Sequence, residues 1–248
     1  MRLLLPTLAA ALLAACGKPS QLGFKVVSTV EHDANCYTQG LELLDGRMFE
    51  SGGGYGSSTL REVDPKTGGV LRKRPMARTV FAEGITILNG ELWVLTWQEH
   101  IAYVFEPDSF KYLRQYKYDG EGWGLTNDGK HLIMSDGSDV IRFIDPDGFK
   151  VVRELAVTSS GKTVEEINEL EFTPAGIYAN IYQTDRIARI SPDNGNVTGW
   201  LDCSALRKQL PPPHRAEVLN GIALDKKTGR FWITGKLWPR MFEVEITE

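Results

Sequence analysis

Hydrophobic and polar residues alternate over short segments along most of the chain, which is the pattern of half-buried β-strands. Four such segments end in proline, at residues 60–65, 103–107, 141–146 and 187–192. A fifth segment, at 241–246, has the same alternation without the proline. Because proline cannot donate a hydrogen bond to a strand ladder, it marks the end of each predicted strand. The pattern therefore predicts a series of strands built on one repeated plan.

A second phrase precedes each of these segments, and in four of its five copies it begins with glycine. The copies are Gly40-Leu41-Glu42, Gly84-Ile85-Thr86, Gly124-Leu125-Thr126, Glu169-Leu170-Glu171 and Gly221-Ile222-Ala223. Successive copies are 40 to 52 residues apart, a spacing typical of repeat architectures. Residues at the same position of a closed repeat face one another, so the repeat indicates which distant residues can meet in one site.

The third repeat shows the internal plan most clearly. Its strands are predicted at 124–126, 131–135, 140–144 and 151–157, and short Asp, Asn and Gly turns join them. Four antiparallel strands, repeated five times, predict an all-β fold: a five-bladed β-propeller with four-stranded antiparallel blades. A β-sandwich without true repeats is the alternative.

Composition and charge narrow the class of protein. No segment has a sustained helical period, and the best helix candidate is 204–209, which the prolines at 211–213 would end. Hydrophobic residues make up 42% of the chain and charged residues 24%, which suits an ordinary globular domain. The net charge is -4 and there is no basic patch or arm, so nucleic acid is not an expected partner.

The N-terminus has the pattern of an export signal. An apolar run at 3–15 is too short to span a bilayer but fits the core of a secretory signal. It ends in Leu13-Ala14-Ala15-Cys16, which resembles the bacterial lipoprotein signal, in which the chain is cut before a cysteine that then carries lipid. A plain signal peptide with an incidental cysteine is the alternative.

These features divide the chain into three parts. We expect a cleaved signal peptide at 1–15, a tether at 16–23 beginning with the lipidated Cys16, and a single propeller domain at 24–248. Lipid would then hold the protein to the bacterial cell envelope, facing the periplasm. Gly17 does not supply the aspartate that typically retains such proteins in the inner membrane, which favours the outer membrane.

Two cysteines remain in the predicted domain. Cys36 lies just before the first repeat and Cys203 just before the fifth. Those repeats would be neighbours in a closed ring, and an exported protein can keep a disulfide. A disulfide between them and two unpaired buried thiols are both compatible with the sequence.

Polar and aromatic residues recur where the innermost strands of a propeller would begin. Directly before the repeat position stand Gln39, Glu83, Trp123 and Asn168, and Tyr37 and Phe81 stand two residues before Gln39 and Glu83. Counting back ten residues from the proline position gives a second layer of Trp97, Asp136, Tyr182 and Lys236. Because equal positions of the repeat lie at the same end of the ring, these side chains are expected to face one pocket.

The predicted pocket contains a carboxyl group, an amine, two amides and an aromatic wall. Burial among aromatic rings raises the pKa of a carboxyl group, which suits it to proton transfer near neutral pH. The histidines have no metal-ligand spacing, and there is no Gly-x-Ser-x-Gly nucleophile motif. The acidic residues at 165–171 are expected to form a solvated loop edge rather than a cation site.

Together these segments resemble the plant-type glutaminyl-peptide cyclotransferases, or glutaminyl cyclases, a family of five-bladed propellers also found in bacteria. The motifs that carry the resemblance are Tyr-Thr-Gln-Gly-Leu-Glu at 37–42, Phe-Ala-Glu-Gly-Ile-Thr at 81–86, Glu-Gly-Trp-Gly-Leu-Thr at 121–126, Ile-Asn-Glu-Leu-Glu at 167–171, Leu-Asn-Gly-Ile-Ala at 219–223 and Gly-Lys-Leu-Trp-Pro at 235–239. They occur in order over nearly the whole predicted domain.

The resemblance implies an enzyme that converts the N-terminal glutamine of a peptide or protein to pyroglutamate and releases ammonia. It implies catalytic roles for Glu83, Lys236, Gln39 and Asn168, and a substrate-binding wall of Tyr37, Phe81, Trp97, Trp123 and Tyr182. The family usually has tryptophan where this chain has Tyr182, which leaves the shape or polarity of one wall open.

The resemblance also implies a reaction without a metal cofactor, and a structural divalent cation in the central channel is compatible with it. The expected partners are substrates with N-terminal glutamine and, through Cys16, a membrane; the chain is expected to be a monomer. Two other hypotheses remain: a metal-dependent propeller hydrolase of the lactonase kind, and a non-catalytic binding propeller.

Overall fold

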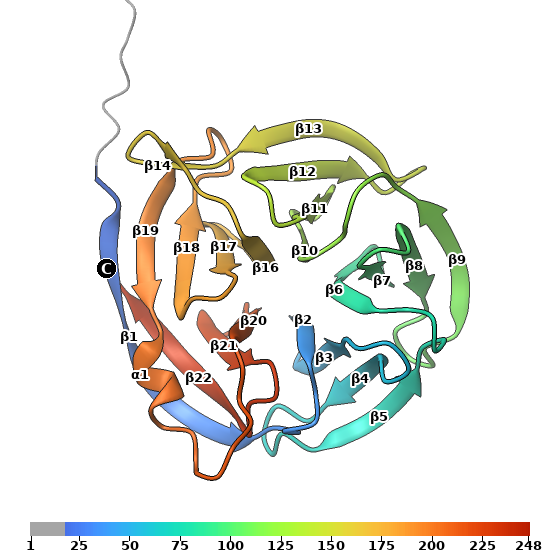
Figure 1. Ribbon diagram of the computed structural model, residues 1–248, viewed down its shortest axis with the longest axis horizontal. Helices are drawn as coiled ribbons and strands as arrows, with labels where there is room; N and C mark the ends of the chain where they lie inside the picture. The colour runs from blue at the N-terminus through green and yellow to red at the C-terminus, as the bar shows by residue number, and fades with distance from the viewer. Residues whose placement is uncertain (1–17) are drawn as a thin grey trace, which may run out of the picture.

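The computed structural model describes residues 18–248, whose sheets are arranged around a central axis (Figure 1). Three sheets each contain four antiparallel strands that follow one another in the chain. The first holds β2 (Thr38–Leu44), β3 (Arg47–Gly52), β4 (Thr59–Val63) and β5 (Val70–Pro75). The second holds β6 (Ala82–Leu88), β7 (Glu91–Thr96), β8 (Ile101–Phe105) and β9 (Tyr112–Lys117). The third holds β10 (Leu125–Asn127), β11 (Leu132–Met134), β12 (Val140–Asp145) and β13 (Lys150–Ala156).

The remaining large sheet has eight strands, in the order β16-β17-β18-β19-β1-β22-β21-β20. Its strands are β1 (Ser20–Glu31), β16 (Ile167–Thr173), β17 (Gly176–Ile181), β18 (Arg186–Ile190), β19 (Val197–Asp202), β20 (Leu219–Asp225), β21 (Arg230–Gly235) and β22 (Arg240–Thr247). Strand β1 pairs in parallel with β19 and antiparallel with β22, so the first strand joins the last two groups of the chain. The predicted all-β architecture with four-stranded antiparallel units is confirmed, and its arrangement is propeller-like.

Strand β1 corrects one predicted boundary. It begins at Ser20, and Ser20, Gln21 and Leu22 pair with residues of β19. Leu22 is buried in the core formed with β22. The tether predicted for residues 16–23 therefore overlaps a strand of the fold. The signal peptide and Cys16 lie outside the described residues.

Only small elements lie outside these sheets. Strands β14 (Thr158–Ser159) and β15 (Lys162–Thr163) form a hairpin, and α1 (Ser204–Arg207) is the short helix expected in this region. Leu206 anchors α1 in the core beside Cys203. Within residues 18–248, no helix has the length and apolar character needed to cross a membrane.

The repeat glycines allow the innermost strands to approach one another closely. Strand β2 contacts β6 and β20, β10 contacts β6 and β16, and β16 contacts β20, so the inner strands form a ring. A Cβ atom on Gly84 would lie 2.4 Å from the backbone nitrogen of Leu125, and one on Gly124 would lie 2.0 Å from the carbonyl oxygen of Asn168. The phrase that reveals the repeat thus marks the contact between neighbouring sheets.

We expect Gly124→Ala to destabilise the fold by about 1–3 kcal/mol, because the added methyl group overpacks a backbone contact. The measurement is the urea midpoint of unfolding at an unchanged slope m. Gly69→Ala is the matched control, since the nearest atom to its added Cβ is the flexible Thr67 hydroxyl, at 3.3 Å. Equal midpoints for the two variants would contradict the close-packing explanation.

Glu169 replaces the repeat glycine in the fourth copy, and its side chain serves a different structural purpose. Its two carboxylate oxygens accept hydrogen bonds from the backbone N–H groups of Leu41, at 3.1 Å, and Ile222, at 2.8 Å. Glu169 thereby links three inner strands, β16, β2 and β20. Glu169 and Glu171 are both buried, so the prediction of a solvated loop edge is wrong for them.

Both cysteines of the described chain are free thiols and both are buried. Cys203 packs in the core formed by β1, β17 to β22 and α1. Cys36 lies between strands β1 and β2, with its sulfur close to Gly52 on β3. Of the two possibilities left open by the sequence, the structure has unpaired thiols.

Candidate active site

An irregular strand register places the polar residues of the site. In three sheets the pairing of the inner strand with its neighbour shifts at the repeat phrase, between Thr38 and Gly40, between Ala82 and Ile85, and between Ile167 and Leu170. Such bulges redirect side chains that would otherwise alternate across the sheet. They fall at Gln39, Glu83 and Asn168, the residues predicted from their position before the repeat phrase.

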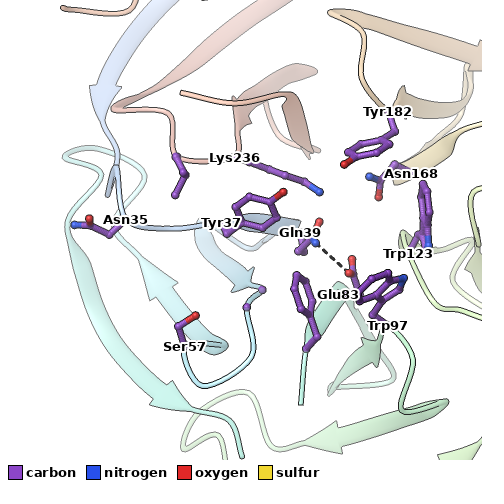
Figure 2. Close-up of a pocket in the computed structure, with 14 residues that line it drawn as sticks. Asn35, Tyr37, Gln39, Ser57, Glu83, Trp97, Trp123, Asn168, Tyr182 and Lys236 are labelled. Carbon is purple, nitrogen blue, oxygen red and sulfur yellow. Dashed lines mark hydrogen bonds between the residues drawn. The ribbon is translucent and has the colours of Figure 1, made fainter. Parts of the chain in front are cut away.

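One cavity of about 510 Å³ collects these side chains at one end of the ring (Figure 2). It contains all nine residues predicted to act in catalysis or substrate binding. Its lining is Asn35, Tyr37, Gln39, Gly53, Gly54, Ser57, Phe81, Glu83, Trp97, Trp123, Asn168, Tyr182, Lys236 and Leu237. Asp136, which the ten-residue count also selected, is not among them and instead forms an ion pair with Arg142.

Glu83 is the only carboxyl group among the residues that line the cavity, and it is buried. Gln39 Nε2 donates a hydrogen bond to Glu83 Oε1 at 3.0 Å (Figure 2). Burial raises the pKa of Glu83 well above its usual range; the charge of Lys236 opposes this, while the charges of Glu121 and Glu99 add to it. The carboxyl group can therefore hold or release a proton closer to neutral pH than an exposed glutamate.

Lys236 brings a buried amine to the same cavity. Its Nζ lies 4.8 Å from the ring centre of Tyr37 and 5.0 Å from that of Tyr182. Burial lowers the pKa of Lys236, while the charges of Glu83 and Glu217 act in the opposite direction. Figure 2 shows its amine directed into the pocket, toward the region between Tyr182 and Gln39. The site thus pairs a hydrogen-bond donor of high charge density with a proton-transfer group.

The aromatic residues form two groups of edge-to-face contacts, one of Tyr37, Phe81 and Trp97 and one of Trp123 and Tyr182. Ring centres are 5.6 Å apart for Phe81 and Trp97, 5.5 Å for Trp123 and Tyr182, and 6.4 Å for Tyr37 and Phe81. Such geometry is favourable for aromatic pairs and leaves ring faces available to a ligand. The wall gives the cavity a mostly apolar lining around a few polar groups, which is typical of small-ligand sites.

Glu121 lies behind this wall and fixes two of its indoles. One of its oxygens accepts hydrogen bonds from Trp97 Nε1 at 2.7 Å and from Trp123 Nε1 at 2.9 Å. Burial alone would raise its pKa, but the hydrogen bonds from Trp123, Gln98 and Trp97 lower the pKa of Glu121 below its usual value. The carboxylate therefore stays charged and holds both rings in place.

We expect Glu121→Ala to raise KM about tenfold, with a smaller effect on kcat. The loss of two charge-assisted hydrogen bonds frees both indoles, and a tenfold change corresponds to about 1.4 kcal/mol. Steady-state kinetics measure the effect, and Glu154→Ala on the exposed strand β13 is the control. An unchanged KM with a large loss of kcat would show that Glu121 acts on the reaction step instead.

Asn168 and Asn220 present the remaining amide groups. Asn168 is buried, and its Oδ1 has no hydrogen-bond partner, so the pocket wall contains an unused acceptor. Asn220 lies beside Gln39 and donates to the backbone oxygen of Thr38 at 3.0 Å. Asn220 therefore supports the backbone that carries Gln39, whereas Asn168 is available to a ligand.

Sequence reasoning missed the part of the lining that comes from the loop after β3. Gly53 packs against Phe81, and a Cβ atom there would lie 2.2 Å from that ring. The glycine at this position thereby makes room for the aromatic wall. A usable signal existed: the same ten-residue count, applied to Pro65 in the first repeat, gives Tyr55. The ring of Tyr55 lies 5.4 Å from that of Phe81.

The comparisons with known proteins agree with one another and cover most of the chain. The model of the glutamine cyclotransferase family matches residues 2–246. The glutaminyl-peptide cyclotransferase of Arabidopsis thaliana is 38% identical over 229 residues, which cover 90% of this chain and 71% of that protein. The crystal structure of Myxococcus xanthus glutaminyl cyclase superposes with a TM-score of 0.85 at 36% identity, covering 93% of this chain and 99% of the other.

Proposed function

The chain belongs to the glutamine cyclotransferase family, and we propose that it performs the reaction of that family by acid–base catalysis centred on Glu83. The enzyme is a glutaminyl-peptide cyclotransferase, an acyltransferase that converts N-terminal glutamine to pyroglutamate. The resemblance inferred from the sequence motifs is thereby confirmed. The observation that carries the mechanism is the buried Glu83 carboxyl group beside Lys236 in an aromatic pocket.

The proposed reaction transfers one proton and replaces one carbon–nitrogen bond with another. The neutral α-amine of the substrate attacks the carbon of its own γ-carboxamide, and a carbon–nitrogen bond forms. Glu83 takes a proton from the attacking nitrogen and gives it to the amide nitrogen. The bond from the carbon to that nitrogen then breaks, ammonia leaves, and the carboxylate is regenerated. The raised pKa of Glu83 suits it both to take the proton from the attacking nitrogen and to give it to the leaving nitrogen.

We propose that Lys236 donates to the carboxamide oxygen as negative charge develops there, because a buried cation is most effective in a site that excludes water. The unpartnered Oδ1 of Asn168 would accept a hydrogen bond from a substrate N–H group. Gln39, expected from the sequence to orient the substrate amide, uses one amide N–H to hold Glu83. Its first role is thus to position the carboxyl group.

The aromatic wall would keep the glutamine side chain folded over its own amine. Holding both reacting groups in contact removes much of the entropic barrier of the ring closure. Tyr182 lies edge-on to Trp123 and beside the Lys236 amine, so it would serve both the wall and the cation. A tryptophan at this position would fill more of the pocket but lacks the phenol group.

The function is tested by incubating the purified protein with a dipeptide that begins with glutamine and measuring ammonia. Release of ammonia, with and without a chelator, is the expected result. Ammonia released only without the chelator would favour metal-dependent catalysis. No ammonia with or without the chelator would contradict the cyclotransferase function and favour a non-catalytic binding propeller. Hydrolysis of a lactone substrate, in turn, would identify a propeller hydrolase.

The proposed chemistry uses no metal cofactor. For a structural divalent cation in the channel, we propose Glu42 and Glu171 as the ligands. Both are buried, and Glu42 Oε2 and Glu171 Oε1 accept hydrogen bonds from Thr86 and Leu224, which leaves one oxygen of each for a cation. Glu169 is less suitable because both of its oxygens bind backbone N–H groups.

We propose that the eight-stranded sheet represents two blades, β16 to β19 and β20 to β22 with β1, which gives a five-bladed propeller. The antiparallel pairing of β1 with β22, the first and last strands of the chain, would close the ring. The same chain is proposed to act as a monomer, since its pocket is lined by its own residues.

We also propose that Cys16 carries lipid and anchors the enzyme to the envelope, in the outer membrane. Cys16→Ser should release the enzyme from the membrane fraction of cells into the soluble periplasmic fraction. Ammonia release from a glutaminyl dipeptide in each fraction measures this. Activity that stays in the membrane fraction would contradict the lipid anchor and favour another attachment.

A further inference from the structure

A second cluster of reactive side chains lies behind the pocket, outside the proposed catalytic machinery. His32 follows β1, Cys36 precedes β2, and Glu50 lies on β3; all three are buried. One ligand atom from each residue lies within 4.8 Å of those of the other two. His32 Nε2 is 2.7 Å from Glu50 Oε1. Nitrogen, sulfur and oxygen donors thus converge on one point inside the protein.

Hydrogen bonds from neighbouring groups fix the orientation of His32 and Glu50. His32 Nδ1 donates to the carbonyl oxygen of Trp238 at 2.6 Å, which points Nε2 at Glu50. The Thr38 hydroxyl donates to Glu50 Oε1 at 2.7 Å. Metal-binding histidines and carboxylates are typically fixed by such partners.

Glu50 supplies a second, independent indication. Its side chain is almost completely buried, yet its Oε2 atom has no hydrogen-bond partner. Arg61, whose guanidinium binds Asp33 at 2.9 Å, approaches Glu50 Oε2 only to 3.9 Å. A buried carboxylate oxygen without a partner is costly unless something else binds it. A cation among the three donors would satisfy that atom.

We propose that His32, Cys36 and Glu50 form a Zn²⁺ site that is separate from the catalytic pocket and from the central channel. Thiolate, imidazole and carboxylate are the ligand types of protein-bound zinc. Binding would release about two protons, one from the Cys36 thiol and one shared between His32 and Glu50, since zinc ligands must be deprotonated. The net charge of the cluster with Arg61 and Asp33 would then stay the same.

The position of this site ties it to both sides of the pocket. Cys36 directly precedes Tyr37, and its carbonyl oxygen accepts a hydrogen bond from the backbone N–H of Leu237 at 2.8 Å. His32 contacts the carbonyl of Trp238, two residues after Lys236. A bound metal ion would hold His32 and Cys36, the two residues whose hydrogen bonds join the Tyr37 segment to the Lys236 segment, and we expect it to stabilise the folded protein.

The site is tested by calorimetric titration of the purified, metal-free protein with Zn²⁺. Titration in two buffers of different ionisation enthalpy gives the number of protons released. The measurement is made on the native protein and again after refolding with Zn²⁺. A site of one ion that releases about two protons, and a rise in Tm on binding, is the expected result. Substitution by Co²⁺ should give a near-ultraviolet charge-transfer band that reports a thiolate ligand.

Two variants test the ligands, and a third variant is the control. Cys36→Ser and Glu50→Gln should each weaken binding at least tenfold. Cys203→Ser, which removes the other buried thiol, should bind Zn²⁺ as the parent protein does. Circular dichroism confirms folding, and Cys36→Ala is the replacement should the serine variant fail to fold. Unchanged affinity in Cys36→Ser, or no binding by native and refolded protein, would reduce the cluster to a buried ion pair.

Discussion

Glu83→Gln should lower kcat by about 10²–10⁴-fold, the range that a positioned acid–base group contributes. The amide cannot carry the proton from the substrate amine to the leaving nitrogen. Its carbonyl oxygen can still accept the hydrogen bond from Gln39 Nε2, so the pocket geometry is retained. Steady-state ammonia release with a glutaminyl dipeptide measures kcat and KM, and we expect KM to change much less than kcat.

The same substitution has a predicted effect on stability, with a definite sign. Burial raises the pKa of Glu83, so between its unfolded and folded values the unfolded chain loses the proton first. The stability contributed by this group therefore falls as the pH rises through that window. Removing the ionisable group should leave Glu83→Gln at least as stable as the parent protein at neutral pH, by urea unfolding.

Glu154→Gln on the exposed face of β13 is the matched control, because it removes an exposed carboxylate that does not line the cavity. Its kcat should equal that of the parent enzyme. A folded Glu83→Gln enzyme with parental kcat would show that another group transfers the proton. A Glu83→Gln protein that is much less stable at neutral pH would instead indicate that the carboxylate is ionised and structurally required.

The sequence predicted the sheets well because each one is specified locally. Alternation, acid–proline ends and Asp, Asn or Gly turns all report on a few neighbouring residues, and the structure confirms the four-strand plan at β10 to β13. The pairing of β1 with β19 and β22 was not predictable in this way. Its pairing with β22 joins the two ends of the chain, and nothing in the local pattern of residues 20–31 identifies partners that far along the sequence, such as Thr247 for Gly23.

The sequence could predict those site residues whose position in the repeat is fixed. Gln39, Glu83, Trp123 and Asn168 could be aligned because each stands before the same phrase, and all four line the cavity. Residues that act through another residue have no fixed position in the repeat, so the repeat could not identify them. Glu121 could be recognised as the partner of two indoles only once Trp97 and Trp123 were placed side by side in space.

The burial of Glu169 and Glu171 also could not be predicted from the local sequence. Glu169 and Glu171 follow the charged residues Glu165 and Glu166, and a run of acids normally indicates solvent. Strand β16 carries Glu169 and Glu171 into the channel, where backbone N–H groups of other strands bind them. Local composition could not predict this, because the donors belong to β2 and β20 at the far ends of the chain.

Lys236→Met should lower kcat/KM by about 10²–10³-fold, the loss typical of removing one donor to a developing oxyanion. Methionine keeps the unbranched apolar stem against Tyr37 and Tyr182, so the packing of the pocket is largely preserved. Removing the amine should also move the acid limb of the kcat/KM profile to higher pH. The Lys236 charge lowers the pKa of Glu83, and without it the pKa of the carboxyl group rises further.

The pH comparison separates this electrostatic role from a steric one. The substrate amine, whose pKa is about 8, also contributes to the acid limb, but equally for both enzymes when the same dipeptide is used. The shift between the acid limb of the parent enzyme and that of Lys236→Met therefore reports on Glu83. Lys162→Met in the exposed hairpin strand β15 is the control and should leave the profile unchanged. A Lys236→Met enzyme whose acid limb stays in place would show that the amine and Glu83 do not interact, and the proposed pairing of cation and carboxyl group would be wrong.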